Sequence, residues 1–327
     1  MMQLIFGFMI SQAVYVAAKL GLADLLKDGP KDFKELAKAT SSHARSLYRV
    51  LRALSSVGVF AETERGVFRL TPLAETLQAD APASMRAMSI FLGGQYNWQA
   101  WGDILHSVKT GEPAFEHVFG TGFFQYVERN PEAAKVFNEA MTSNSAPFSA
   151  AVAAAYDFSH IGTLVDVGGG HGSLITSILK AYPNLKAMLY DVPHVSEGAR
   201  RQIEAEGVAE RCTVVAGDFF ESVPAGGDAY MMKNIIHDWD EASAVTILRN
   251  CRRAMGKDAR LLLVEEVIPC SNEASIGKFI DLEMLLMPGG LERTEAEYRT
   301  LFEAAGFRLT SITPTQSPLS VIEGMPA

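Results

Sequence analysis

The sequence predicts an α/β protein with a Rossmann-like, doubly wound sheet that includes an antiparallel C-terminal strand. An all-helical, winged-helix-like domain, whose wing is a short hairpin, precedes it. Three observations predict this fold: helical periodicity up to about residue 155, a buried-strand pattern that runs into four glycines in LVDVGGGHG at 164–172, and alternating strand and helix patterns from Thr163 onward. At 327 residues the chain exceeds the usual size of one domain. We therefore expect two domains, residues 1–155 and 156–327.

The first domain is predicted from helices that accompany a hairpin. Helical periodicity is clear at 32–40, 46–58 and 130–141, where Pro131 suits a first helical turn. The run VFAETERGVFRLT at 59–71 divides into two strand-like halves around a turn. Two helices followed by a two-stranded wing are typical of a winged helix.

The apolar segment Leu4–Ala18 opens the chain. It lacks a basic start, it is interrupted by Ser11 and Gln12, and it is shorter than the roughly 20 residues that a spanning helix needs. We therefore expect no membrane partner, and we interpret the segment as a helix buried against another protein surface, that of a partner subunit.

Composition and charge bound the functional class. With 48% apolar and 20% charged residues the chain is an ordinary globular protein, and its net charge of −9 argues against nonspecific binding of nucleic acid. The cysteines lack the close spacing of zinc and redox motifs, so we expect no metal and a reducing, cytoplasmic location. They are Cys212, Cys251 and Cys270.

Strand patterns in the second domain are separated by helical stretches, which implies right-handed crossovers and a parallel sheet. These patterns lie at 163–168, 187–192, 212–218, 229–235 and 259–268. Two further patterns, at 307–313 and 319–325, are joined only by residues 314–318. This short connection suits a hairpin that places an antiparallel strand in the sheet.

Polar residues follow the ends of these strands in order. Ligands of doubly wound sheets lie outside the carboxyl ends of the strands, so these side chains should converge. Asp191 stands 23 positions after Gly168 (191 minus 168), close to the usual place of a ribose-binding acid. At the next strand end Asp218 could accept an adenine amino proton, and Phe219 could cover the base. The series predicts a nucleoside site.

The glycine spacing alone also admits a nicotinamide dinucleotide. Counted from Gly168, the usual dinucleotide fingerprint needs a glycine at 173, where this chain has Ser173. The carboxylate of Asp166 would repel a pyrophosphate and attract a positively charged ligand. The loop therefore favours a sulfonium nucleoside such as S-adenosylmethionine.

Five motifs occur along the chain in a fixed order: LVDVGGGHG, YDVPHV, GDFF, KNIIHDWDE and PGGLERT. Together they resemble the motifs of the class I S-adenosylmethionine-dependent small-molecule O-methyltransferases, a family that includes plant caffeic-acid-type enzymes and bacterial antibiotic and pigment methyltransferases. The resemblance implies S-adenosyl-L-methionine as the cofactor. It also implies a first domain that forms a homodimer and caps the substrate.

By this resemblance His237 is the general base, and the acids Glu265 and Glu292 flank it. A phenol of pKa about 10 gives its proton to an imidazole of pKa about 6.5 uphill by about 5 kcal/mol in water, so the histidine needs help. One carboxylate can fix the imidazole tautomer, and nearby negative charge stabilises the imidazolium. The residues expected to hold the donor for in-line methyl transfer are Asp166, Gly168, Gly170, Asp191, Asp218, Phe219, Lys233 and Trp239.

The resemblance further implies a small aromatic or heterocyclic acceptor that carries a hydroxyl, most simply a phenol. The family lines its acceptor pocket from the helix before the catalytic domain and from the helix after the fifth strand. The candidate residues are Phe137, Met141, Asn234, Asp281, Met284 and Met287.

Two other functions remain open. Arg45, Arg49 and Arg52 form a basic stripe at helical spacing, as on the recognition helix of a DNA-binding winged helix. The acidic chain and the family's use of this module favour dimerisation without nucleic acid. A repurposed enzyme of the same fold could also bind the donor without transferring its methyl group, but the presence of His237 with both acids speaks against that.

Overall fold

The computed structural model describes the backbone of residues 1–82 and 84–327, and the side chains of the same residues apart from 144–147. The chain forms two compact units. The first comprises Met1–Gly102 and Phe124–Asn144, and the second comprises Asp103–Phe123 and Ser145–Ala327. Helix α11 (Pro131–Ala155) therefore begins in the first unit and ends in the second. The functional division at residue 155 stays a prediction.

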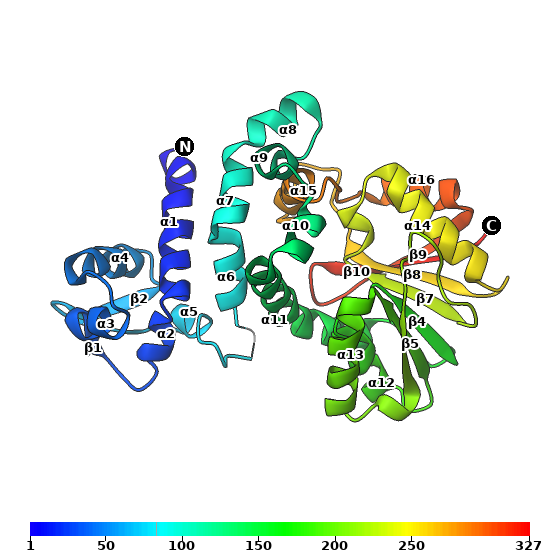
Figure 1. Cartoon of the computed structure of the whole chain (residues 1–327), viewed down its shortest axis with the longest axis horizontal. Coiled ribbons are helices and arrows are strands. Elements are labelled where there is room, and N and C mark those ends of the chain that lie inside the picture. Colours follow the sequence, from blue (N-terminus) through cyan, green and yellow to red (C-terminus); the bar gives the residue numbers. More distant parts are fainter. Residues whose placement is uncertain (83) are drawn as a thin grey trace. The chain divides into compact units, whose positions relative to one another are not determined.

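The first unit contains the predicted winged-helix elements (Figure 1). Its main helices are α1 (Met2–Lys19), α3 (Phe33–Ala39) and α4 (Ala44–Ser56), and its hairpin pairs β2 (Phe60–Glu64) with β3 (Val67–Leu70). A two-residue strand, β1 (Lys31–Asp32), pairs with β3 and adds a third strand that the sequence did not predict. Leu36, Leu51 and Phe68 are fully buried in the core of this unit.

Short helices complete the first unit. In α6 (Arg86–Gly93), which packs on α1, a Cβ at Gly93 would lie 2.4 Å from the Cβ of Tyr15, so a glycine permits this close approach. The other short helices are α2 (Leu22–Leu25), α5 (Pro72–Glu75), α7 (Gln95–Gly102) and α10 (Phe123–Arg129), which begins at the border between the units.

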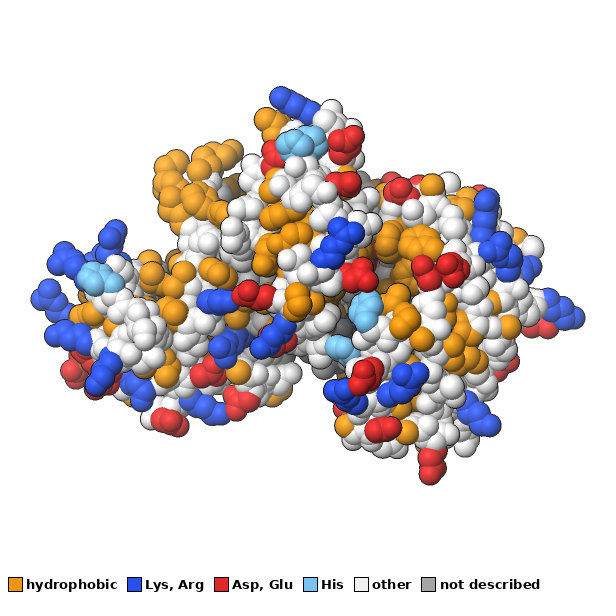
Figure 2. Space-filling model, in the orientation of Figure 1, with side chains coloured by type: hydrophobic (Ala, Val, Ile, Leu, Met, Phe, Trp, Pro, Cys, Tyr) orange, Lys and Arg blue, Asp and Glu red, His pale blue; other side chains and the backbone are white. Residues whose placement is uncertain are grey.

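The first half of α1 exposes a row of apolar side chains, which Figure 2 shows as an orange patch: Met2, Leu4, Ile5, Phe6, Phe8, Met9 and Ile10. By length and composition alone, this 18-residue helix could also cross a membrane. Exposed apolar patches on folded proteins commonly mark interaction sites. The exposure therefore fits the interpretation of α1 as a helix that packs against a partner subunit.

The second unit contains the predicted sheet, whose seven strands are ordered β6-β5-β4-β7-β8-β10-β9. Five strands are parallel, and β10 runs antiparallel between β8 and β9, which confirms the predicted C-terminal hairpin. The strands are β4 (Thr163–Val167), β5 (Lys186–Asp191), β6 (Cys212–Ala216), β7 (Ala229–Lys233), β8 (Arg260–Glu266), β9 (Phe307–Pro314) and β10 (Leu319–Pro326).

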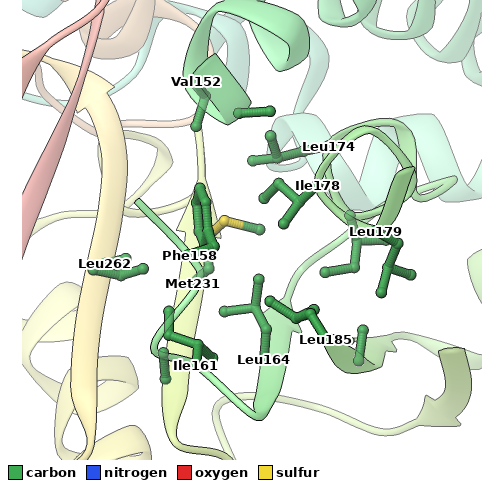
Figure 3. Close-up of a cluster of buried hydrophobic side chains, with 14 of the residues drawn as sticks. Val152, Phe158, Ile161, Leu164, Leu174, Ile178, Leu179, Leu185, Met231 and Leu262 are labelled. Atoms are coloured by element: carbon green, nitrogen blue, oxygen red, sulfur yellow. The ribbon is translucent and has the colours of Figure 1, made fainter. Parts of the chain in front are cut away.

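Helices cover both faces of this sheet. One core packs α12 (Ser173–Ala181), α13 (Pro193–Ala205) and the end of α11 on the sheet, with Phe158 and Leu164 at its centre (Figure 3). The other core packs α14 (Glu241–Ala254) and α16 (Glu295–Ala305) on the opposite face. The remaining helices are α8 (Ile104–Thr110), α9 (Ala114–Phe119) and α15 (Gly277–Leu286), which packs on both of them, and the 3-10 turns η1 (Ala209–Arg211) and η2 (Ile236–Asp238).

Candidate active site

The glycine turn follows the central strand β4. Gly168 and Gly170 have φ angles of +70° and +57°, a backbone region that side chains with a Cβ rarely adopt. A Cβ on Gly168 would also lie 2.5 Å from Cδ1 of Ile235, at the end of the neighbouring strand β7. The turn is fixed by the N–H of Gly168, which donates to the carbonyl of Tyr190 at 2.8 Å. The predicted ligand-binding turn is therefore tightly built.

Asp166 lies beneath this turn and is 2% exposed. Its Oδ2 has no hydrogen-bond partner among the residues that the structure describes. Burial raises the pKa of Asp166 to about 7, and Lys233 opposes that rise. A buried carboxylate with an unused oxygen is a favourable neighbour for a ligand cation. This observation fits a sulfonium nucleoside and does not fit a pyrophosphate.

Asp191 ends the next strand and holds the glycine turn. Its Oδ2 accepts the N–H of Gly170 at 2.8 Å, and its Oδ1 accepts the N–H of Val192 at 2.7 Å. Burial raises the pKa of Asp191, although these two hydrogen bonds oppose the rise. The structure thus brings Asp191 to the turn, as predicted for a ribose-binding acid.

Aromatic rings gather near the end of β6. The Trp239 ring makes edge-on contacts with Phe219 and with Phe220, whose ring centre is 4.7 Å away, and the two phenylalanine rings are tilted relative to each other. Asp218 is exposed, and its Oδ1 accepts the N–H of Phe220 at 2.8 Å. Asp218, the predicted adenine acid, therefore lies in one group with Phe219 and Trp239, two other residues expected to hold the donor, and with Phe220, which the sequence did not single out.

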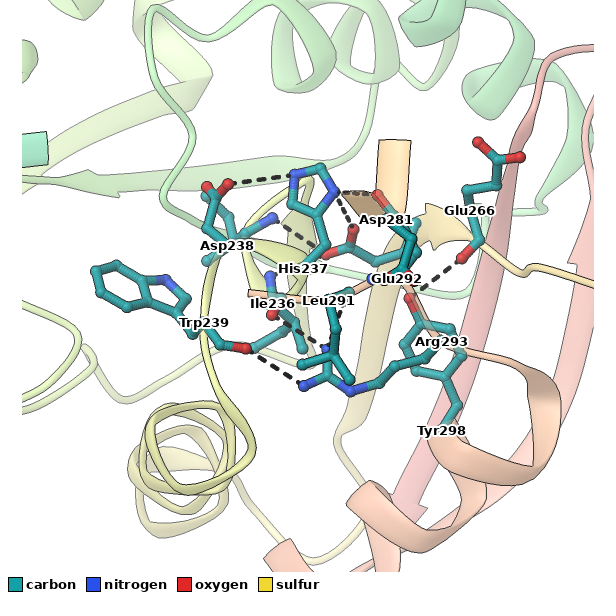
Figure 4. Close-up of polar contacts among 12 residues, drawn as sticks. Ile236, His237, Asp238, Trp239, Glu266, Asp281, Leu291, Glu292, Arg293 and Tyr298 are labelled. Carbon is teal, nitrogen blue, oxygen red and sulfur yellow. Dashed lines mark hydrogen bonds and ion pairs between the residues drawn. The ribbon is translucent and has the colours of Figure 1, made fainter. Parts of the chain in front are cut away.

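His237 lies on η2, after β7, and three carboxylates surround its imidazole (Figure 4). Glu292 Oε1 accepts a hydrogen bond from Nδ1 at 2.6 Å, and Glu265 Oε2 lies 3.7 Å from the same nitrogen. On the other side of the ring, Asp238 Oδ1 lies 3.6 Å from Nε2. The two acids predicted to flank the histidine are both in place.

These carboxylates change the basicity of the histidine. Burial alone would lower the pKa of His237, but the charges of Glu265, Asp238 and Glu292 outweigh it and raise the pKa to about 10. Burial also raises the pKa of Glu265, and it raises that of Asp238 to about 6. In the ligand-free protein the imidazole therefore holds a proton at neutral pH.

Glu265 also shapes the backbone that carries the histidine. It is fully buried at the end of β8, and its Oε1 accepts the N–H groups of Ile235 at 3.1 Å and Ile236 at 2.9 Å. Asn234, just before them, has a φ of +52° and a buried side-chain oxygen without a described partner. A strained backbone with an unused polar atom is common at functional sites.

The loop before α16 brings Glu292 to the histidine. The N–H of Leu291 donates to the carbonyl of His237 at 2.9 Å, and a Cβ on Gly290 would lie 1.9 Å from that carbonyl oxygen. Asp281 Oδ1, on α15, accepts the N–H of Glu292 at 2.9 Å. Asp281, predicted as an acceptor contact, is thus placed where it supports the base.

The other acceptor candidates are distributed over both units. Met284 and Met287 lie at the end of α15, where Met287 is buried and the Met284 carbonyl accepts the N–H of Gly290 at 3.1 Å. Phe137 and Met141 belong to the part of α11 in the first unit, and the Phe137 ring lies 5.8 Å from that of Phe91. The roles of these residues in acceptor binding stay predictions.

Two parts of the site escaped the sequence analysis. Asp238 directly follows the predicted base in the sequence, and this adjacency could have predicted that its carboxylate lies near the imidazole. Arg293 is fully buried beside the site, although arginine is normally a surface residue and no local pattern marks it. Only the tertiary fold shows its contacts.

Two groups of side chains lie close enough to share a metal ion: His237, Glu265 and Glu292, and the group Asp103, His106 and His117. In the second group the imidazole rings are stacked 3.9 Å apart with planes at 7°, so their in-plane lone pairs do not converge. In the first group, Glu292 already accepts the Nδ1 proton. We assign no metal to either group.

Comparisons with known proteins agree with this geometry. Residues 101–308 match the family model of the O-methyltransferase domain, and residues 2–80 match that of the O-methyltransferase dimerisation domain. A phenazine O-methyltransferase of Lysobacter antibioticus is 47% identical over 326 residues, which cover 100% of this chain and 95% of that protein. A mitomycin biosynthesis 6-O-methyltransferase of Streptomyces lavendulae is 39% identical over 315 residues, covering 96% and 90%.

A solved structure adds ligands to this comparison. The O-methyltransferase NcsB1 from neocarzinostatin biosynthesis, in complex with S-adenosylmethionine and 2-hydroxy-5-methyl naphthoic acid, is 34% identical with a TM-score of 0.86. The match covers 97% of this chain and 96% of that one. The chain therefore belongs to the family of S-adenosylmethionine-dependent O-methyltransferases and carries that family's dimerisation domain.

Proposed function

We propose that this enzyme methylates a hydroxyl, most simply a phenolic one, of a small aromatic or heterocyclic secondary metabolite, with His237 as the general base. One observation carries the proposal: the 2.6 Å contact of Glu292 with Nδ1 orients the imidazole and leaves Nε2 for the acceptor proton. The supporting acids are Glu265 and Glu292.

The residues around the glycine turn fit S-adenosyl-L-methionine. Asp166 offers an unused buried oxygen to a cation, and Asp191 has lone pairs left for ribose hydroxyls. When bound, this cofactor supplies an electrophilic methyl group on a positively charged sulfur. The residues that would hold it are Asp166, Gly168, Gly170, Asp191, Asp218, Phe219, Lys233 and Trp239.

The carboxylates around His237 bring its basicity close to that of a phenolic acceptor. A phenol has a pKa of about 10, so an ordinary imidazole would accept its proton about 5 kcal/mol uphill. The surrounding charges raise the pKa of His237 to about 10, which makes the proton transfer nearly thermoneutral. The imidazole must first lose its own proton, and this ties turnover to pH.

The proposed assembly follows from the same resemblance, and the proposed location follows from the spacing of the cysteines. We propose a homodimer in which the apolar face of α1 packs against the partner subunit, in the cytoplasm of a cell that makes the acceptor. The residues proposed to contact the acceptor are Phe137 and Met141 of α11, Asn234 directly after β7, Asp281 and Met284 of α15, and Met287 directly after it. These side chains are mostly apolar, which suits a flat aromatic ligand.

The test is a methyl-transfer assay with S-adenosylmethionine and a panel of phenols, catechols and hydroxylated heterocycles, read as S-adenosylhomocysteine formed. We expect a methylated product with at least one acceptor. His237→Ala should abolish transfer and retain donor affinity, measured by calorimetry. His43→Ala, which removes an exposed histidine of the first unit, is the matched control.

Two results would overturn the proposal. Undiminished transfer by His237→Ala would remove the histidine from the role of base. Donor binding without transfer to any acceptor in the panel would instead favour a repurposed, non-methylating enzyme of the same fold.

A further inference from the structure

Arg293 is a fully buried arginine between the segments that carry the base and its acid partner. Its Nη1 donates to the carbonyls of Ile236 and Leu291, both at 3.3 Å. Its Nη2 donates to the carbonyl of Trp239 at 3.4 Å and to Glu241 Oε2 at 3.2 Å. Figure 4 shows the guanidinium beneath the loop that holds His237. One side chain therefore joins the backbone on both sides of His237 to the backbone next to Glu292.

The main chain of Arg293 adds a third connection. Its carbonyl accepts the N–H of Ile268 at 3.0 Å, and the residue forms a bridge with Val267. These residues directly follow β8, the strand that ends with Glu265 and Glu266. Arg293 thus contacts each of the three chain segments that carry His237, Glu265 and Glu292.

The contacts at this position suit the guanidinium of an arginine better than the ammonium of a lysine. A guanidinium presents five N–H donors in a rigid planar fork, whereas a lysine ammonium is a compact charge on a flexible stem. Burying a charge is costly unless partners surround it. Here three carbonyl groups and one half-exposed carboxylate accept from Nη1 and Nη2, whereas the buried Nε has no hydrogen-bond partner among the described residues. A buried charge that is retained at this cost suggests that the arginine holds the neighbouring backbone segments in place.

We propose that Arg293 is a positioning residue that sets the separation of the His237 imidazole and the Glu292 carboxylate. It acts through these two residues: among the described residues its guanidinium donates to backbone carbonyls and to Glu241, and not to the side chain of His237 or Glu292. This inference rests on the proposed role of His237 as the general base.

The test compares Arg293→Lys with Glu241→Gln, which leaves the arginine in place and removes the charge of its half-exposed partner. The first readout does not depend on activity: the NMR signal of the His237 Nδ1 proton, assigned by its loss in His237→Ala. The short hydrogen bond to Glu292 should give a far-downfield signal, which we expect Arg293→Lys to lose or move strongly upfield. Glu241→Gln should move it slightly.

The second readout is the transfer rate against pH at saturating donor. Arg293→Lys should lower the rate by about a hundredfold and shift the pH profile, because a displacement of about 1 Å at a reacting group has effects of this size. Donor affinity should fall far less than the rate, because Trp239 is the donor-holding residue that the guanidinium contacts, and it does so only through the Trp239 backbone carbonyl. Glu241→Gln should shift the profile in the same direction by a smaller amount.

An unchanged proton signal and pH profile in a folded Arg293→Lys protein would overturn the inference. Parallel loss of donor affinity and rate would also overturn it, because that pattern marks general damage to the fold. If Arg293→Lys does not fold, Glu241→Gln decides: an unmoved signal and profile refute the role. A wild-type protein without transfer activity would refute the proposed function alone, because the NMR signal still tests the positioning.

Discussion

The donor side and the base side of the second unit are built in different ways. On the donor side, the glycine turn follows one strand and is held by the strand beside it, because the Tyr190 carbonyl accepts the N–H of Gly168 and Asp191 Oδ2 accepts that of Gly170. On the base side, His237 is surrounded by carboxylates from three separate segments. Donor affinity should therefore depend on one turn and the strand beside it, whereas proton transfer should depend on contacts between segments that are far apart in the sequence.

The largest effect on the base side is expected from a substitution of Gly290. A Cβ there would lie 1.9 Å from the carbonyl of His237, and backbone atoms cannot move aside cheaply. We expect Gly290→Ala to lower the transfer rate by more than about a hundredfold, through displacement of the base. Overpacking of this kind should also cost about 3 kcal/mol of unfolding free energy, measured by denaturant titration.

Gly102→Ala is the matched control for this substitution, because no atom lies within 4 Å of the added Cβ in α7. It should change stability and rate little. An active and stable Gly290→Ala protein would show that the backbone around His237 can move without loss of proton transfer.

Glu292→Gln separates charge from hydrogen bonding on the base side. The amide oxygen can still accept from Nδ1, but removing the negative charge lowers the pKa of His237. The rate should therefore begin to rise at lower pH, and its plateau should fall by about ten- to hundredfold because the base is weaker. Rates measured from pH 6 to 10 test this. A profile that moves to higher pH would contradict the assignment of Glu292.

Gly168→Ala probes the donor side. A residue with a Cβ pays about 1–2 kcal/mol in this left-handed conformation, and the added atom also meets Ile235. We expect the donor Kd to rise about thirtyfold, which corresponds to about 2 kcal/mol, with the rate at saturating donor largely retained. Calorimetry and single-turnover rates distinguish the two. A lower transfer rate with an unchanged donor Kd would contradict the assignment of the glycine turn to donor binding.

The smallest effect is the pH dependence of donor binding. Because the pKa of Asp166 is about 7, its ionised fraction grows about tenfold between pH 6 and pH 8. A positively charged donor prefers the ionised form, so its affinity should rise by up to that factor over this range. S-adenosylhomocysteine, with a neutral sulfur, should respond less, and Asp166→Asn should flatten both curves. Equal slopes for the two ligands in the wild type would remove Asp166 from contact with the sulfonium.

The sequence predicts the donor side of the site more fully than the base side. The glycine turn and the acids Asp191 and Asp218 follow strand patterns directly, so their convergence could be predicted from the order of the strands. The strand β1 escaped because two residues carry no periodicity. In each successful case the signal lay within a few neighbouring positions.

The base side was predicted only where the family resemblance named residues. His237 and Glu292 are 55 positions apart, and no local pattern specifies their contact. The position of Asp281 on α15 predicts a contact with the acceptor, but it does not reveal that Oδ1 of Asp281 accepts the N–H of Glu292. Arg293 was missed because burial of a charged residue is a property of the tertiary fold.

The contact of Gly290 with the His237 carbonyl also has an evolutionary consequence. Because a Cβ does not fit there, residue 290 cannot change from glycine to a larger residue in small steps. Met284 of α15, a proposed acceptor contact, takes part in this arrangement through its backbone carbonyl, which accepts the N–H of Gly290, so its side chain can vary separately. A lineage built on this chain could therefore exchange one acceptor for another while inheriting its proton-transfer apparatus unaltered.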